Sequence, residues 1–219
     1  MLDSATISMF AVGLLESLYM TLVSTFIAYL IGLPMGILAV VTEKDNILPI
    51  KSLNSILNTI INITRSIPFL ILMIAIIPLT KKIVGTPIGS TATIVPLVVS
   101  AAPFIARMVE SSIKEVDKGV IEAALSMGAS PFQIIYKVML PEAKPSLIVG
   151  VAIVTTTILG YSAMAGAVGG GGLGAIAINY GYHRYEYFIM FVTIILLIIL
   201  VQIFQEIGMR IADKQDKRK

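Results

Sequence analysis

The chain has 219 residues, of which 57% are hydrophobic and only 13% are charged. An ordinary globular domain is roughly 45–50% apolar and about 25% charged, so a soluble protein of this size has too little interior for so many apolar side chains. The composition excludes a secreted domain, a cytosolic enzyme and a disordered chain, and it predicts one integral membrane domain. The net charge of +3 does not indicate nucleic acid as a partner, because basic residues in membrane proteins usually report orientation.

Two rare residue types limit the chemistry of the chain further. The sequence contains no cysteine and one histidine, which excludes disulfides, cysteine nucleophiles and a multi-histidine metal centre. We therefore expect no metal site and no catalytic residues.

Continuous apolar runs of about 20 residues predict membrane-spanning helices, whereas strands of a membrane barrel alternate over about ten residues. Spans are expected at residues 17–41, 56–79, 88–109, 146–168 and 187–207. The predicted fold is thus an all-α integral membrane protein with five transmembrane helices, forming a single domain over residues 1–219. It includes a polar loop at residues 110–145 and a basic tail at residues 210–219.

The distribution of charge predicts the orientation. No Lys or Arg precedes Lys44, so the N-terminus lacks the basic start of a signal peptide and is expected to be mature and outside. All Lys and Arg except Lys81, Lys82 and Arg184 then lie inside, in agreement with the positive-inside rule. The loop at residues 110–145 and the C-terminus are predicted to be cytoplasmic. Tyrosines mark the outer interface ahead of the last span: Tyr180, Tyr182, Tyr185 and Tyr187.

The second predicted span contains a charged residue, Arg65. A cation at the bilayer centre costs about 2.5–3.5 kcal/mol on insertion scales. We expect Arg65 to snorkel to the cytoplasmic face or to pair with Glu110 or Glu43. Two alternatives stay open: residues 53–64 form an interfacial helix and the span is short, or Arg65 has a role on a transport path.

Prolines interrupt the second and third spans. Pro68 weakens the backbone hydrogen bonding beyond Arg65, and Pro96 and Pro103 are expected to kink the third span, so all three are candidate hinges. Arg107 and Glu110 lie on one helix face and are expected to form a local ion pair.

The polar loop is predicted to contain two short helices. Asp117 and Gly128 are expected to cap the first, and Ser130 to cap the second, with Gln133 completing a capping box. The second helix is expected to end before Pro141. A solvated linker needs neither caps nor apolar side chains, so this pair either packs beneath its own bundle or docks into another protein. The apolar side chains concerned are Val120, Ile121, Leu125 and Met127.

Part of this loop resembles the EAA motif of ABC importer permeases, with Val138 where the family usually has Ile. The motif residues are Glu122, Ala123, Ala124, Gly128, Leu140 and Pro141. In that family the loop is the coupling helix, which sits in a cleft of the ATPase subunit. The resemblance implies that these residues transmit closure of the ATPase to the membrane helices.

Further stretches resemble the permeases of methionine importers in particular, over about residues 10–211. They are residues 65–69, 94–97, 101–110, 160–164 through Gly174, and 180–182. The resemblance implies a type I importer permease of the bacterial inner membrane. It also implies a homodimer, two copies of an ABC ATPase, an external substrate-binding protein, and methionine as the substrate.

Two features near the outer end of the fourth span carry further hypotheses. Met164, beside Tyr161 and Ser162, is a candidate gate that side chains from both copies would close; ordinary packing is the alternative. Residues 169–174 fit the dinucleotide pattern G-x-G-x-x-G, but no strand precedes them. We expect these glycines to serve close contacts, or alternatively a flexible outer segment.

The chain has no phosphate-binding P-loop pattern, G-x-x-x-x-G-K-[ST]. If ATP drives it, a separate subunit binds ATP and Mg²⁺, and this chain is neither an enzyme nor a holder of cofactors. The alternatives are an importer of another small amino acid or peptide, and an ion-coupled secondary transporter. The latter is disfavoured because Glu16 and Glu206 lie only at span borders, whereas such carriers usually have intramembrane carboxylates.

Overall fold

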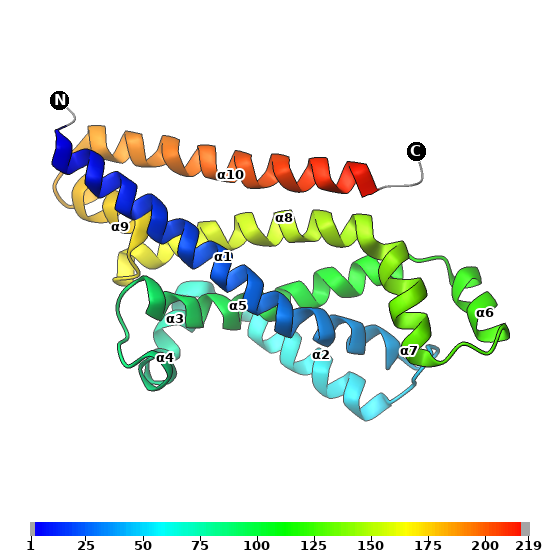
Figure 1. Ribbon diagram of the computed structural model, residues 1–219. Helices are drawn as coiled ribbons and strands as arrows, with labels where there is room; N and C mark the ends of the chain where they lie inside the picture. Colours follow the sequence, from blue (N-terminus) through cyan, green and yellow to red (C-terminus); the bar gives the residue numbers. More distant parts are fainter. Residues whose placement is uncertain (1–2, 216–219) are drawn as a thin grey trace.

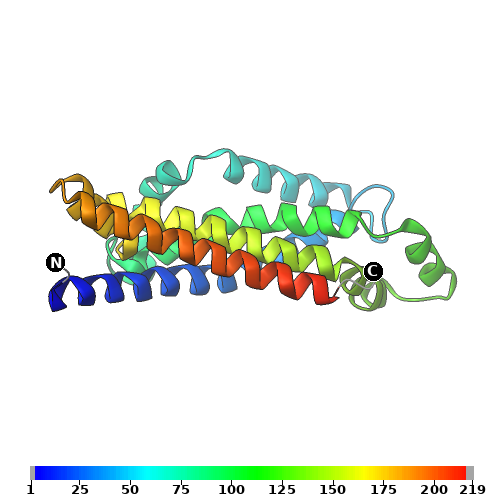
Figure 2. The ribbon, with the colours of Figure 1, turned by 90° about the horizontal axis from the view of Figure 1, so that it is seen from above.

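The computed structural model describes residues 3–215, and within this range every regular element is a helix. Four long helices have roughly aligned axes, and α8 runs opposite to the other three: α1 (Ser4–Val41), α5 (Ser90–Lys114), α8 (Leu140–Ala165) and α10 (Tyr187–Gln215) (Figures 1 and 2). Shorter helices are attached at the two ends of this bundle.

Four helical stretches are long and apolar enough to cross a membrane, and a fifth crossing results if one bent pair counts as a single span. The all-α prediction is thus confirmed. Two helices extend past the predicted bounds. Helix α1 starts at Ser4 rather than at residue 17, and α10 runs to Gln215 rather than to residue 207. The end of the predicted basic tail, residues 216–219, lies outside the described residues.

The second predicted span, residues 56–79, is bent and not one straight helix. The chain forms α2 (Lys51–Ser66), α3 (Phe69–Ala75) and α4 (Ile77–Val84), and α2 and α3 meet at 103°. Pro68 lies at the bend, where its ring and missing N–H prevent continuation of the helix. The alternative of a separate helix at residues 53–64 is closer to the structure. Pro96 and Pro103, in contrast, lie inside an unbroken α5.

Close packing of α1 against α5 forms the centre of the molecule, and small residues make it possible. A Cβ atom added at Gly32 would lie 2.6 Å from the carbonyl oxygen of Ala102 and 2.7 Å from the Cβ of Ile105. Ile105 is completely buried. Membrane helices gain little from apolar burial against each other, so such close backbone approach and van der Waals contact hold the pair together.

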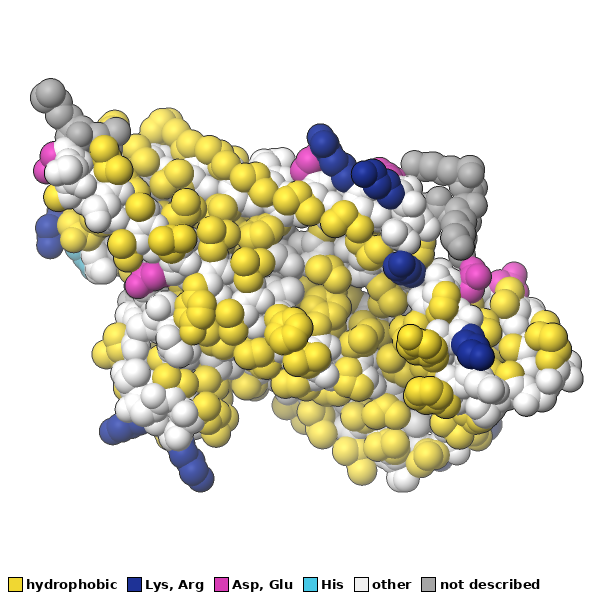
Figure 3. Space-filling model, viewed as in Figure 1, with side chains coloured by type: hydrophobic (Ala, Val, Ile, Leu, Met, Phe, Trp, Pro, Cys, Tyr) yellow, Lys and Arg dark blue, Asp and Glu magenta, His cyan; other side chains and the backbone are white. Residues whose placement is uncertain are grey.

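The outer surface of the bundle suits lipid. Figure 3 shows a broad apolar face with charged side chains gathered toward its ends. In the most apolar 18-residue stretch of α10, only 17% of the residues are buried. Its exposed side chains are apolar over most of its length: Phe188, Phe191, Ile194, Ile195, Ile198, Ile199 and Ile203.

The remaining elements lie at opposite ends. At one end, beyond α5, are α6 (Lys118–Ser126), α7 (Pro131–Ile134) and the π-helix η1 (Ile135–Met139), which leads into α8. At the other are η2 (Gly166–Val168), α9 (Gly172–Ile176) and the π-helix η3 (Ala177–Tyr182). Helix α4, which carries Lys81 and Lys82, lies toward the second end, away from α6 (Figure 1).

Candidate functional site

Helix α6 has the predicted caps at both ends. The Asp117 carboxylate accepts a hydrogen bond from the backbone N–H of Gly119 at 2.6 Å. At the other end Gly128 has a φ of 76°, its N–H donates to Leu125, and the N–H of Ala129 donates to Ala124. This pair of bonds is a Schellman motif, which needs the left-handed conformation that glycine adopts at no steric cost. The first half of the loop is therefore an ordered, independently terminated helix.

The motif residues on α6 divide between two faces. Ala124 is buried against the rest of the loop, whereas Glu122 and Ala123 are exposed. Apolar side chains around them are exposed as well: Val120 (43%), Leu125 (47%) and Met127 (81%). The hypothesis that α6 packs beneath its own bundle thus accounts for one face only. The rest of the helix is open, and its exposed side chains combine apolar groups with Lys118, Glu122 and Ser126.

The second half of the loop begins as predicted and ends differently. Ser130 and Gln133 form the capping box: the Ser130 N–H donates to the Gln133 side chain at 2.9 Å, and the Gln133 N–H donates to the Ser130 hydroxyl at 3.4 Å. The helix does not end before Pro141. The wide π turn of η1 carries the chain into α8, which has Pro141 in its first turn. The motif residues Leu140 and Pro141 therefore start a membrane helix.

Exposed aromatic side chains accompany α7. Phe132 and Tyr136 are 74% and 65% exposed, and their rings are stacked with centroids 6.3 Å apart.

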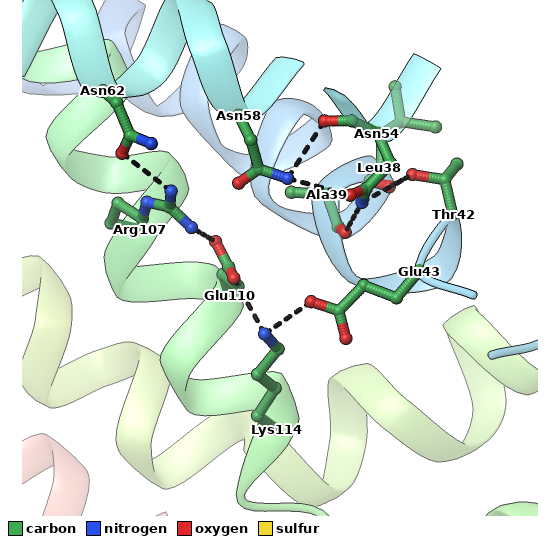
Figure 4. Close-up of polar contacts among 10 residues, drawn as sticks. All are labelled: Leu38, Ala39, Thr42, Glu43, Asn54, Asn58, Asn62, Arg107, Glu110 and Lys114. Carbon is green, nitrogen blue, oxygen red and sulfur yellow. Dashed lines mark hydrogen bonds and ion pairs between the residues drawn. The ribbon is translucent and has the colours of Figure 1, made fainter. Parts of the chain in front are cut away.

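A row of polar side chains joins α5 to its neighbours at the same end of the molecule (Figure 4). Glu110, only 7% exposed, accepts from Arg107 and from the Lys114 ammonium, the latter at 2.9 Å. Lys114 also pairs with Glu43 at 2.5 Å, and the Arg107 guanidinium donates to the Asn62 side chain at 2.8 Å. The predicted Arg107–Glu110 ion pair is confirmed, and it is part of a larger network.

The predicted pairing of Arg65 with Glu110 or Glu43 is wrong. Both carboxylates are paired with cations of α5 instead. Glu110 pairs with Arg107 and Lys114 on its own helix, and Glu43, after the end of α1, pairs with Lys114. Arg65 is exposed at the last turn of α2, where its guanidinium lies 5.9 Å from the ring centroid of Phe104.

The candidate gate residues have different surroundings. Met164 is 45% exposed, Tyr161 is half-buried, and Ser162 is buried with its hydroxyl donating to the Leu159 carbonyl at 2.8 Å. Tyr161 stacks on the buried Phe69 of α3, with ring centroids 4.6 Å apart and planes within 3°. Met164 thus reaches the surface of the protomer, Tyr161 joins α8 to the bent segment, and Ser162 stays inside.

The glycine-rich segment after α8 packs against backbone on both sides. A Cβ atom at Gly166 would collide with Gly174 and Ala175, and one at Gly174 with Ala163. The start of α9 is fixed by α1: the Gly172 N–H donates to the Glu16 carboxylate at 2.6 Å, and the Leu173 N–H donates to the Ser17 hydroxyl at 2.9 Å. The prediction of close contacts is therefore confirmed.

Several of these contacts were missed by sequence reasoning. Asn62 and Glu43 have no local pattern that points to Arg107 or Lys114, since 45 residues separate Asn62 from Arg107. Glu16 is 156 residues from Gly172. A carboxylate near a span border was the available signal for Glu16.

Comparison with known proteins gives consistent results. A family model described as "Binding-protein-dependent transport system inner membrane component" matches residues 32–214. The chain is 52% identical over 203 residues to a probable D-methionine transport system permease protein from Vibrio cholerae, covering 93% of this chain and 90% of that protein. It is 46% identical over 177 residues to the methionine import system permease protein of Bacillus subtilis, covering 81% and 80%.

A solved structure is also similar. The chain matches a structure of the MetNI methionine ABC transporter in an inward-facing conformation, with a TM-score of 0.96 and 47% sequence identity. The match covers 98% of this chain and 100% of that one.

Proposed function

We propose that this chain, which belongs to the family of binding-protein-dependent transport system inner membrane components, is the permease subunit of an ATP-driven methionine importer. The observation that carries the proposal is the open face of α6, an ordered helix with exposed apolar side chains around Glu122 and Ala123. A helix of this kind serves binding of another protein, since exposed apolar surface of this sort marks interaction sites. The two relatives described above are methionine transport permeases by name.

The α6 face docks into a separate ATPase subunit. Glu122 is the charged anchor, and Ala123 lets the partner backbone approach closely. Gly128 ends the helix, so the docked segment is short and rigid. ATP and Mg²⁺ bind to the ATPase subunit, because this chain has no P-loop pattern. The chain itself carries no catalytic residue.

Two copies of the chain surround the path, with two ATPase subunits on the cytoplasmic side. The exposed residues of α1 and α10 within the bundle are mostly large and apolar and face lipid, whereas those of α8 include the small Gly160 one turn from Met164, which suits close contact with another helix. The α8 face is therefore directed to the two-fold axis, where closed symmetry of a homodimer brings the two copies of Met164 together as a gate. Tyr161 supports this gate from the side.

The N-terminus is outside and the C-terminus and α6 are cytoplasmic, in accordance with the positive-inside rule. The basic residues on the outer side are Lys81, Lys82 and Arg184. The tyrosines near α10 lie at the outer interface, where a loaded binding protein docks.

Transport follows from these parts. ATP draws the two ATPase subunits together, the α6 helices move with them, and the membrane helices change from inward-facing to outward-facing. Methionine passes from the binding protein into the cavity, and hydrolysis resets the pair. The few polar groups in the membrane helices leave most of the selectivity to the binding protein.

Reconstitution tests the proposal. The chain is placed in liposomes with its ATPase subunit and a methionine-binding protein, and uptake of labelled methionine is measured with and without ATP. Glu122→Lys should abolish uptake and weaken co-purification of the ATPase while the chain stays folded. Asp45→Lys, a matched charge reversal in the exposed loop between α1 and α2, should leave both unchanged. Normal uptake with Glu122→Lys overturns the assignment of α6.

A second experiment addresses the competing transport classes. Uptake that continues with an ion gradient and no ATP would favour a secondary transporter. Replacing the binding protein by one for a different amino acid should change the transported solute; if the new solute is bound but never transported, the permease itself discriminates.

A further inference from the structure

The row of polar contacts in Figure 4 connects three separate elements. Arg107, Glu110 and Lys114 belong to α5, whereas Asn62 belongs to α2 and Glu43 follows the end of α1. The bonds alternate in charge, from the Glu43 carboxylate through Lys114 and Glu110 to Arg107, and end on the neutral Asn62 amide. The α5 cations thus tie their helix to both neighbours at once.

Burial makes this arrangement specific. Glu110 is almost fully buried, and a buried carboxylate that loses its partners is strongly unfavourable. Arg107 and Lys114 are therefore held to Glu110, and each has one further polar contact to spare. Those second contacts are the ones that leave the helix, to Asn62 and to Glu43.

Helix α2 is fastened to α1 independently of α5. The Asn54 side chain donates to the Ala39 carbonyl at 2.6 Å and to the Thr42 hydroxyl at 3.2 Å. One turn further along, the Asn58 side chain donates to Asn54. The end of α1 and the start of α2 are consequently one unit. It packs on α5 through the buried side chains of Ala39, Ile61 and Ala106, and its polar links to α5 are Asn62 and Glu43.

The network lies next to the docking helix. Lys114 is the last residue of α5, and after residues 115–117 the chain enters α6. A displacement of α6 therefore acts through residues 115–117 on the end of α5 at Lys114, and through residues 127–130 on α7.

We propose that Arg107 and Lys114 are positioning residues that transmit the displacement of α6 from α5 to α2 and the end of α1, so that these three cytoplasmic ends move together. The inference rests on the proposed function of α6 as the ATPase docking helix. Without the two outward contacts only apolar packing joins α2 to α5, so α2 follows the displacement less closely and ATP hydrolysis is less tightly coupled to opening of the path.

Three variants test this, with a matched control. Asn62→Leu is the sharpest, because it removes the link to α2 and leaves Glu110 with both of its cations. Lys114→Met removes the link to Glu43, and Arg107→Met removes the link to Asn62 from the α5 side. The control is Arg210→Met: Arg210 pairs with Glu206 at 2.6 Å on α10 at the same end of the molecule, but this pair stays within one helix.

The first measurement is methionine uptake per ATP hydrolysed in reconstituted complexes. We expect Asn62→Leu and Lys114→Met to lower this ratio about two- to thirtyfold, the range that residues transmitting coupling between distant sites span. Association with the ATPase subunit and the ATPase rate should not fall, and Arg210→Met should match the unmodified complex.

The second measurement detects motion that a purely structural role would not alter. The chain has no cysteine, so Ser55→Cys on the exposed side of α2 accepts a single spin label in each copy of the dimer. The distance between the two labels should change when ATP is trapped. This change should shrink in Asn62→Leu and Lys114→Met and persist in Arg210→Met.

The outcomes are distinct. An uptake ratio and a label displacement that stay unchanged in all three variants overturn the proposal, as does a lower thermal stability with a normal uptake ratio. If Asn62→Leu fails to assemble, Lys114→Met decides the question. Absence of ATP-driven uptake in the unmodified complex refutes the proposed function itself.

Discussion

The contact between α1 and α5 offers a quantitative test of the fold. In Gly32→Ala the added Cβ would lie 2.6 Å from the carbonyl oxygen of Ala102 and 2.7 Å from the Cβ of Ile105. The first of these atoms is backbone and the second is fixed to it, so no rotamer change relieves either contact. The two helices must separate instead.

The size of the effect follows from that separation. A gap of about 0.5–1 Å forfeits a quarter to a half of each dispersion contact across the interface, and overpacking of interiors costs about 1–3 kcal/mol. Replacing a helical glycine returns up to about 1 kcal/mol of backbone entropy. We therefore expect Gly32→Ala to lower the free energy of unfolding by about 1–2 kcal/mol. Gly160→Ala on α8 is the control for the separated chain, because its Cβ meets no atom of the same chain within 4 Å.

The assay is SDS-induced unfolding of the purified chain in mixed micelles, followed by far-ultraviolet circular dichroism. Gly160→Ala should be neutral or up to about 1 kcal/mol more stable than the unmodified chain. The reasoning is refuted if Gly32→Ala proves as stable as Gly160→Ala, since the two changes add the same atom to the same kind of helix.

Other expectations concern the outer segment, the bent segment and the loop. Glu16→Ala should cost about 1–2 kcal/mol by leaving the Gly172 N–H without its acceptor, and should increase proteolysis of residues 169–176; Glu16→Gln, which retains an acceptor, should be milder. Phe69→Ala should lower the free energy of unfolding by about 3–5 kcal/mol and release Tyr161, while Phe69→Tyr should keep the stacked rings. Equal losses of stability in both variants would argue against a role of the stack. Ser130→Ala should cost about 1 kcal/mol and raise hydrogen exchange in α7 but not in α10, and uniform protection would contradict the capping role.

Local features were predictable from the sequence. The caps of α6 and α7 depend on residues within a few positions of one another, so Asp117, Gly128 and Ser130 could be assigned before any tertiary contact was known. The long apolar helices follow from the same local information. The Arg107–Glu110 pair belongs here too, because residues three apart on a helix are neighbours.

The remaining features depend on contacts between distant parts of the chain. Hydropathy treats residues 56–79 as one run, because it registers apolar side chains and not the 103° turn at Pro68. The sequence suggested Glu110 or Glu43 as partners of Arg65, but the α5 cations lie nearer to both carboxylates. The residues most in doubt were therefore those whose partners belong to another helix.

The π-helix that joins α7 to α8 has a mechanical consequence. From Pro131 to Tyr182 the backbone is helical almost without interruption, and α7 runs steeply across the direction of α8 (Figures 1 and 2). The second half of the loop is thus a bent, continuous helix with a short and a long segment. The short segment, α7, lies beside α6, and the long segment, α8, carries Met164. A π turn holds one residue more than an α turn. The rotation of α7 relative to α8 about the helix axis therefore depends on the number of residues in η1. Deleting one residue from η1 would rotate α7 by about 100° about the helix axis relative to α8. The deletion would change the orientation of the loop without removing any residue of α6.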